Sequence, residues 1–140
     1  MSQEDINSIL NKNIYNHEKN NFGHVILVMK DIVSLRLKNS NVDLFISKIS
    51  EEVTKSIEIS KKHGNSTIYI HTYLENCLLR NLPIMVFRKM NRILSERFTD
   101  VVESIFIYSN SKFVAKLWPI IKMIVDPETR EKVQILNTSP

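Results

Sequence analysis

The fold is decided by residues 101–136, which read VVESIFIYSNSKFVAKLWPIIKMIVDPETREKVQIL. The stretch begins with β-branched and aromatic side chains, which are typical of a strand. It continues with apolar side chains at helical spacing, then with Asp-Pro-Glu-Thr, and ends on a second apolar run. It therefore predicts a strand, a helix, a short helical turn and a strand at residues 101–108, 112–125, 126–129 and 133–136. Ser109 and Ser111 are candidate caps of the longer helix.

The preceding part of the chain repeats this alternation. Residues 24–29 are apolar without interruption, which predicts a strand buried on both faces, as in a parallel sheet. Residues 41–62 carry apolar side chains every three or four positions, which predicts an amphipathic helix capped by Asn41 and ended near Gly64. A further strand is predicted at residues 66–72, which are rich in β-branched and aromatic side chains.

Another helix is predicted to open at Pro83, where proline is tolerated, and to end near Phe98. Its inward side chains are Met90, Ile93 and Leu94, with either Met85 or Val86 in the preceding turn. Residues 74–82 form a connector that contains Cys77. Alternating apolar residues after the first strand either extend it or join it to the next helix: Val33, Leu35 and Leu37.

The N-terminus predicts a short arm. Residues 2–10 fit a helix capped by Ser2, and residues 11–22 are polar and rich in asparagine, as in a linker. We therefore predict an arm and linker over residues 1–21 and a domain over residues 22–140. The element order αβαβαβαβ predicts an α/β fold with a small, mainly parallel four-stranded sheet and right-handed crossovers.

Composition narrows the function classes. A chain of 140 residues predicts one domain with its own core. The single cysteine excludes an internal disulfide and a cysteine-based zinc cluster, and it favours a reducing, cytoplasmic location. The sequence shows no secretory signal and no apolar run long enough to span a membrane. The net charge of +4 suits contact with an anionic membrane or an acidic partner, and it is well short of a nucleic-acid-binding tail.

No catalytic or metal-binding pattern stands out. The four histidines are not spaced as ligands on one helix, and the two glycines leave no glycine-rich phosphate loop. A nucleophile made of Cys77 and His71 is conceivable, but a buried cysteine and a hydrogen-bonded strand histidine are favoured. The aromatic residues lie in apolar runs rather than among basic side chains, which argues against nucleic-acid binding. We expect no catalytic residue, no metal, no cofactor and no enzymatic activity.

The C-terminal half resembles CRAL-TRIO lipid-binding domains. In that family a strand that ends near an Asn leads into an apolar helix with Trp or Phe, and an Asp-Pro-x-Thr-x-x-Lys turn leads into the next strand. Residues 105–136 follow this order, and the resemblance extends more generally over residues 22–136. The family's N-terminal helical subdomain and C-terminal segment have no counterpart. BCH-type domains, which bind small GTPases and their regulators, are similar at residues 68–72.

This resemblance implies that helix 112–125 is a mobile gate over a lipid-filled cavity. Pro119 within it would kink the helix or restrict its start. The apolar face of the helix supplies the implied lipid contacts: Phe113, Leu117, Trp118, Ile121 and Val125. The alternative is that this face is ordinary core.

Family members that bind phosphatidylinositol use an acidic residue before the third strand and the Thr and Lys of the Asp-Pro turn. The resemblance therefore implies headgroup contacts from Asp100, Thr129 and Lys132, although Asp100 is shorter than the usual Glu. A lysine and a hydroxyl donate hydrogen bonds to phosphate, and a carboxylate accepts from an inositol hydroxyl. In the alternative, which we favour, Asp126 and Thr129 only shape the turn and Lys132 is solvated.

Two functions follow as expectations. The first is a lipid-binding or lipid-transfer module that holds one hydrophobic ligand, with a phosphoinositide as a candidate, between the sheet and helix 112–125, in peripheral contact with membranes. The second is a degenerate CRAL-TRIO-like or BCH-like module that binds a protein partner and has no ligand cavity. Because the missing segments would expose apolar surface, we also predict a homodimer.

Overall fold

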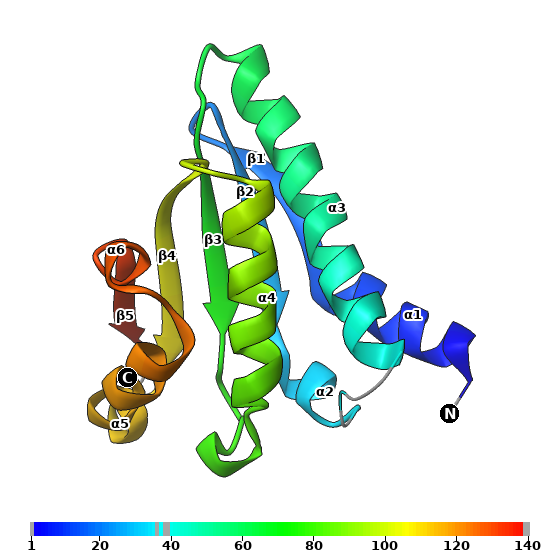
Figure 1. The fold of residues 1–140 in the computed structure, drawn as a ribbon, viewed down its shortest axis with the longest axis vertical. Coiled ribbons are helices and arrows are strands. Elements are labelled where there is room, and N and C mark those ends of the chain that lie inside the picture. The colour runs from blue at the N-terminus through cyan, green and yellow to red at the C-terminus, as the bar shows by residue number, and fades with distance from the viewer. Residues whose placement is uncertain (1, 36, 38–39, 139–140) are drawn as a thin grey trace.

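The computed structural model describes residues 2–35, 37 and 40–138. The helices lie on one side of a five-stranded sheet (Figure 1). In chain order the elements are α1 (Gln3–Asn13), β1 (Ile14–Lys19), β2 (Phe22–Val28), α2 (Met29–Val33), α3 (Ser40–Lys62), β3 (Ile68–Tyr73), the 3-10 turn η1 (Leu79–Asn81), α4 (Ile84–Arg97), β4 (Val102–Ser109), α5 (Ser111–Ile124), α6 (Pro127–Arg130) and β5 (Val133–Asn137).

The strands lie side by side in chain order, from β1 to β5. β1 pairs antiparallel with β2, whereas every later pair is parallel, with His24 opposite Tyr69 and Ile107 opposite Ile135. The predicted α/β class with a mainly parallel sheet is confirmed, with five strands instead of four. Residues 23–27 of β2 are all buried, which accounts for its uninterrupted apolar sequence.

The predicted linker at residues 11–22 is wrong, because this segment ends α1 and then forms the edge strand β1. Asn20 and Asn21, with φ angles of 53° and 72°, make the hairpin turn to β2, a conformation that asparagine tolerates. Ile14 is fully buried, but the other side chains of β1 are partly or fully exposed. An edge strand with a largely solvated surface has the polar composition of a linker.

The predicted N-terminal helix is confirmed. Ser2 caps α1 in a capping box, because its hydroxyl accepts from the Asp5 N–H at 3.2 Å and the Asp5 carboxylate accepts from the Ser2 N–H at 3.1 Å. Ile6 and Leu10 are buried in the main core, together with side chains of α3. The arm is therefore packed on the rest of the chain.

The first strand ends earlier than predicted, because Met29 starts the helix α2. Val33 is the last residue of α2, and Leu35 and Leu37 are buried beyond it. These alternating residues join β2 to the next helix and do not extend the strand. Their apolar character comes from burial in the main core, not from strand periodicity.

Gly23 allows α3 to approach the sheet closely. A side chain at this position would lie 2.0 Å from the Ser56 carbonyl oxygen, so only glycine fits here. The Gly23 N–H donates to Ser60 Oγ at 2.8 Å, and the Ser60 hydroxyl donates to the Thr67 carbonyl at 2.7 Å. One buried serine thus ties α3 to the starts of two neighbouring strands.

The predicted helix at residues 41–62 is confirmed, but it begins one residue earlier, so Asn41 lies inside the first turn and is not the cap. Gly64, with a φ angle of 77°, follows the end of α3 as expected. Pro83 is the N-cap of α4 rather than its first residue, and Val86 rather than Met85 faces inward, because Met85 is 71% exposed.

The cap predicted for helix 112–125 is wrong. α5 is preceded by Asn110 as its N-cap, and Ser109 is the buried last residue of β4, where its carbonyl accepts from the Thr138 N–H at 2.8 Å. The predicted turn after α5 is confirmed as α6, with Asp126 as its cap. The chain therefore enters β5 through the turn that the Asp-Pro sequence indicates.

All the helices that connect parallel strands lie on one face of the sheet. The strands follow chain order in a single direction, so successive crossovers of the same hand are stacked on the same side. Figure 1 shows α3 and α4 in front of the strands, with α5 and α6 near β4 and β5. This arrangement makes one covered face and leaves the other face of the sheet without a crossover helix.

Candidate functional site

A cavity of about 310 Å³ lies between the covered face of the sheet and the helices. Its walls come from α3, α4 and α5, and its lining is mostly apolar. The floor consists of side chains that alternate along four adjacent strands and point to the covered face: Leu27, Ile70, Thr72, Ile105, Ile107 and Val133. A partly open, mostly apolar space of this size is at the lower end of the range for small-molecule sites.

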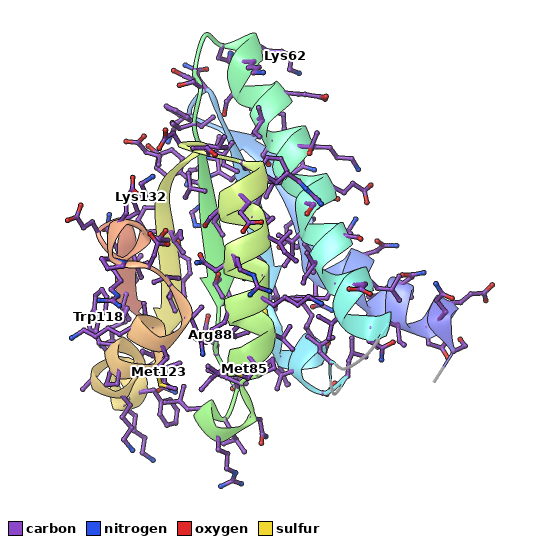
Figure 2. All side chains as sticks on the ribbon, viewed as in Figure 1. Lys62, Met85, Arg88, Trp118, Met123 and Lys132 are labelled. Carbon is purple, nitrogen blue, oxygen red and sulfur yellow. The ribbon has the colours of Figure 1, made fainter. Side chains whose placement is uncertain are left out.

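Helix α5 contributes one wall of the cavity. Leu117 and Ile121 are buried and line it, and Val125, which follows the helix, lines it as well. Phe113 and Trp118 do not line the cavity, and Trp118 is 38% exposed at the outer edge of α5 (Figure 2). The structure thus brings together three of the five residues that the resemblance implied as lipid contacts.

Helix α4 forms the opposite wall, which the sequence indicated only as core. Phe87, Met90, Leu94 and Phe98 recur every three or four residues and line the cavity. Asn91, Ser95 and Thr99 line it too, and their spacing of four residues places them along one edge of the same helix and its end. In the sequence, a row of polar residues beside a row of apolar residues, both at helical spacing, was the pattern that could have indicated a helix at the mouth of a cavity.

The polar end of the cavity brings Asp100 together with Thr129 and Lys132, which lie much later in the sequence. Asp100 lies in the turn after α4 with a φ angle of 56°, Thr129 lies in α6, and Lys132 directly precedes β5. Asp126 and Glu128 also line this end. The lining residues at this end thus include three carboxylates and a single lysine.

The hydroxyl of Thr129 already has a partner. It donates to Asp126 Oδ1 at 2.6 Å, and the Thr129 N–H donates to Oδ2 of the same carboxylate at 3.2 Å. These hydrogen bonds hold the pKa of Asp126 below its ordinary value. The pair forms the cap of α6, as the alternative interpretation of the sequence expects, and the Thr129 oxygen keeps only lone pairs for a ligand.

A shallow groove runs along the outer side of α4 and α5. Met85, 71% exposed, and Met123, 56% exposed, lie at its two sides, close together at the same end of the molecule (Figure 2). Four cationic side chains line the groove, and two acidic ones oppose them: Arg88, Lys89, Arg92 and Lys122, with Glu96 and Asp126. The groove is thus cationic with exposed apolar tips.

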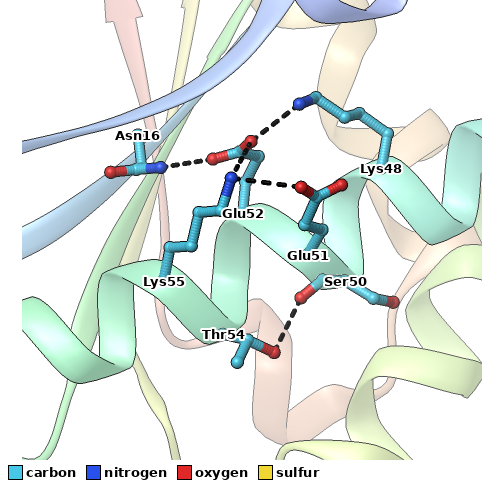
Figure 3. Close-up of polar contacts among 7 residues, drawn as sticks. All are labelled: Asn16, Lys48, Ser50, Glu51, Glu52, Thr54 and Lys55. Carbon is cyan, nitrogen blue, oxygen red and sulfur yellow. Dashed lines mark hydrogen bonds and ion pairs between the residues drawn. The ribbon is translucent and has the colours of Figure 1, made fainter. Parts of the chain in front are cut away.

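A second polar cluster joins α3 to β1 and is structural (Figure 3). The carboxylate of Glu52 is buried and accepts from Lys48 at 2.7 Å and from the Asn16 amide, and Lys55 lies 3.7 Å away. Burial raises the pKa of Glu52, but the hydrogen bonds and the two lysine charges more than offset it and hold that pKa below its ordinary value. The buried charge is therefore fully paired.

Within the described ranges, no group of three or more His, Cys, Asp or Glu side chains is placed to hold a metal ion. No helix in this part of the chain combines the length and the apolarity needed to cross a membrane.

Cys77 is buried, and burial raises the pKa of its thiol. Both ring nitrogens of His71 are hydrogen-bonded, one to His24 and the other to Tyr108.

The family model of the CRAL/TRIO domain matches residues 11–140. This chain belongs to the CRAL/TRIO family. The resemblance read from residues 105–136 is thereby confirmed, and the match also includes β1, which the sequence pattern did not reveal. CRAL/TRIO domains bind lipids, so membership supports a lipid-binding or lipid-transfer module as the general class and lends no support to an enzyme.

The fold agrees with this CRAL/TRIO membership. The crystal structure of Sfh5 superposes with a TM-score of 0.68 at 13% sequence identity, over 92% of this chain and 48% of that one. This CRAL/TRIO chain thus spans about half the length of that solved structure. No curated protein matches the sequence.

Proposed function

We propose that this CRAL/TRIO domain binds one hydrophobic ligand in the cavity between the sheet and α5. The observation that carries the proposal is a cavity of about 310 Å³ with apolar walls and one polar end. An apolar tail gains by leaving water for such a space, and the polar end can hold a headgroup. The ligand's apolar part would contact Leu117 and Ile121 from one side and Leu94 from the other.

Helix α5 is the wall that we expect to move when the ligand enters. Pro119 has no N–H, so the carbonyl of Ala115 lacks its helical hydrogen bond and the helix is weakened at this turn. Phe113 and Trp118 stand outside the cavity on the same helix, and we propose that they contact the ligand or the membrane only when α5 has moved. A movable wall is needed because a cavity of about 310 Å³ is small for a lipid with two acyl chains.

The polar end suits a headgroup with hydroxyls and little negative charge. Asp100 can accept from a hydroxyl, and Lys132 can donate to one phosphate. The nearby carboxylates of Asp126 and Glu128 would repel further phosphates. Among phosphoinositides we therefore propose phosphatidylinositol itself rather than its polyphosphorylated forms.

The groove lined by Met85, Arg88 and Met123 is where we propose that the domain contacts a membrane. Exposed apolar tips can enter the headgroup layer while the cations attract anionic lipids. The groove lies along the seam between α4 and α5, so contact there would place the moving wall next to the lipid source. The setting would be the cytoplasmic face of a membrane.

The test is native mass spectrometry of the purified chain, followed by organic extraction of whatever co-purifies. Leu94→Trp should fill the cavity from α4 without adding charge, so a bound lipid and uptake of labelled phosphatidylinositol from vesicles should both be lost in a folded protein. Leu78→Trp makes the same substitution at an exposed residue that lines neither the cavity nor the groove, and it should retain both. Equal uptake by the two variants would contradict the proposed site.

The second candidate is the protein-interaction module without a ligand cavity. It predicts that side chains fill the space behind α5, whereas Trp118 and Phe113 leave it open. A chain that carries no lipid and takes up neither phosphatidylinositol nor phosphatidylcholine would support this candidate instead.

A further inference from the structure

The face of the sheet opposite the cavity carries a layer of stacked aromatic rings. Because side chains alternate along a strand, the residues next to the cavity floor point to this face. Ring centroids are 5.1 Å apart for His24 and His71, 5.2 Å for His71 and Phe106, and 4.3 Å for Tyr73 and Tyr108. We call this layer the aromatic face, and it consists of His24, Tyr69, His71, Tyr73, Phe106 and Tyr108.

In the part of the chain that the structure describes, no helix packs on the aromatic face. The crossover helices α3, α4 and α5 all cover the cavity side, and α1 packs with α2 and α3. Ile26, which points to the aromatic face, is buried but does not belong to the main core. Parallel sheets in proteins are ordinarily covered on both faces, whereas helices of the described residues cover only one face of this sheet.

The imidazole nitrogens within the aromatic face are already hydrogen-bonded. The Lys19 carbonyl can only accept, so His24 Nε2–H donates to it at 3.1 Å and His24 Nδ1 accepts from His71 Nε2–H at 2.8 Å. His71 Nδ1 then accepts from the Tyr108 hydroxyl at 2.8 Å. Both imidazoles are neutral in this chain of bonds, so a partner can cover these two rings without leaving an imidazole donor unpaired or burying a charge.

The charges beside the aromatic face are self-complementary. Lys19 ends β1 and Glu103 lies at the bulge of β4, both at the end of the sheet where β2 and β3 begin. They lie on opposite sides of β2 and β3. A two-fold axis parallel to the strands superposes β1 of one copy on β4 of the other, which brings each Lys19 towards Glu103 of the second copy.

The area is sufficient for a dimer. In this arrangement four strands of each copy overlap, β1 to β4, and at about 4.8 Å per strand and about 3.3 Å per residue they make a face of about 19 by 20 Å. Because side chains make each surface uneven, two such faces together bury more than their flat area. The total reaches about 1,000 Å², the area that a specific interface should bury. The core of the interface would be aromatic with charges at its rim, as in other interfaces.

We propose that two copies of this chain form a symmetric dimer in which their aromatic faces pack against each other, with each Lys19 opposite the other copy's Glu103. The dimer is a sheet-on-sheet sandwich with the two cavities on its outer sides. The ligand site and the groove between α4 and α5 remain open to solvent in this arrangement, so dimer formation is independent of lipid binding.

The test is the mass of the full chain measured by sedimentation equilibrium between about 1 and 100 µM. We expect twice the chain mass of 16.4 kDa for the wild type. Phe106→Lys places a charge in the interface twice, where β4 of each copy faces β1 of the other, and should raise the dimer dissociation constant at least about 100-fold. Met123→Lys makes a similar change on an exposed methionine of the opposite side and should leave the dimer intact.

Exchanging the charges of Lys19 and Glu103 tests the proposed geometry of the dimer. Both residues are exposed, so the substitutions should not disturb the fold. Lys19→Glu and Glu103→Lys should each weaken the dimer about 5- to 10-fold, and the double variant should restore it to within about threefold. A wild-type monomer at 100 µM, or a Phe106→Lys dimer of unchanged affinity, would overturn the proposal. A double variant weaker than both single variants would overturn the two-fold arrangement.

Discussion

Nδ1 of His24 and Nε2 of His71 lie 2.8 Å apart, in neighbouring parallel strands. Desolvation and the facing charges of His24, His17 and Lys19 lower the pKa of His71 to about 4, and desolvation lowers the pKa of His24 as well. Both are therefore neutral in the folded chain at pH values where they would be partly charged in the unfolded chain.

We expect the free energy of unfolding to fall as the pH falls from about 6.5 towards 4. In this window the unfolded chain binds protons at the two histidines and the folded chain does not, so the stability they contribute is complete above pH 6.5 and is lost on acidification. Urea titrations at pH 7.5 and 5.0 measure the difference, which should be about 1–2 kcal/mol after allowance for partial exposure. His71→Phe should remove most of it. An unchanged pH dependence in that variant would contradict the assignment.

Two buried serines of α3 should respond in opposite ways to alanine. Ser60→Ala removes the partner of the Gly23 N–H and of the Thr67 carbonyl, so we expect a loss of about 1–3 kcal/mol in the free energy of unfolding. Ser56 Oγ is buried and has no hydrogen-bond partner among the described residues, so Ser56→Ala should be neutral or stabilising. Chemical denaturation of both variants decides this, and a costlier Ser56→Ala would refute it.

The role of Asp126 as the cap of α6 can be tested separately from headgroup binding. Asp126→Ala should lower the free energy of unfolding by about 1 kcal/mol, because the Thr129 N–H and hydroxyl lose their acceptor. Asp126→Asn retains an acceptor and should recover most of this loss. Glu128→Ala, a neighbouring change at the same cavity end, is the control and should be nearly neutral. Thermal unfolding of the three variants compares them.

Charge reversal in the groove should weaken binding to anionic vesicles. Arg88→Glu should reduce the partition coefficient on phosphatidylserine-containing vesicles at least about tenfold, because each basic side chain near such a surface contributes about 1 kcal/mol. Lys62→Glu makes a similar change at the far tip of the molecule and should have little effect (Figure 2). Cosedimentation at two salt concentrations measures both, and equal losses would indicate non-specific attraction.

The sequence by itself determined the α/β class, because continuous apolar runs and helical periodicity reflect burial within single elements. It also determined the family, through the order of a strand, an apolar helix and the Asp-Pro turn at residues 105–136, and it placed Asp100, Thr129 and Lys132 as candidates that do meet at one end of the cavity.

Only the tertiary structure decided the rest, because it depends on which surfaces meet. β1 was not recognisable, since an edge strand with exposed side chains has no apolar signature. Trp118 and Leu117 are adjacent in sequence, yet only Leu117 reaches the cavity, because neighbours on a helix point about 100° apart. The aromatic face likewise could not be predicted from the sequence. Alternation along a strand shows which side chains share a face, but which rings lie side by side depends on which strands pair and in which register.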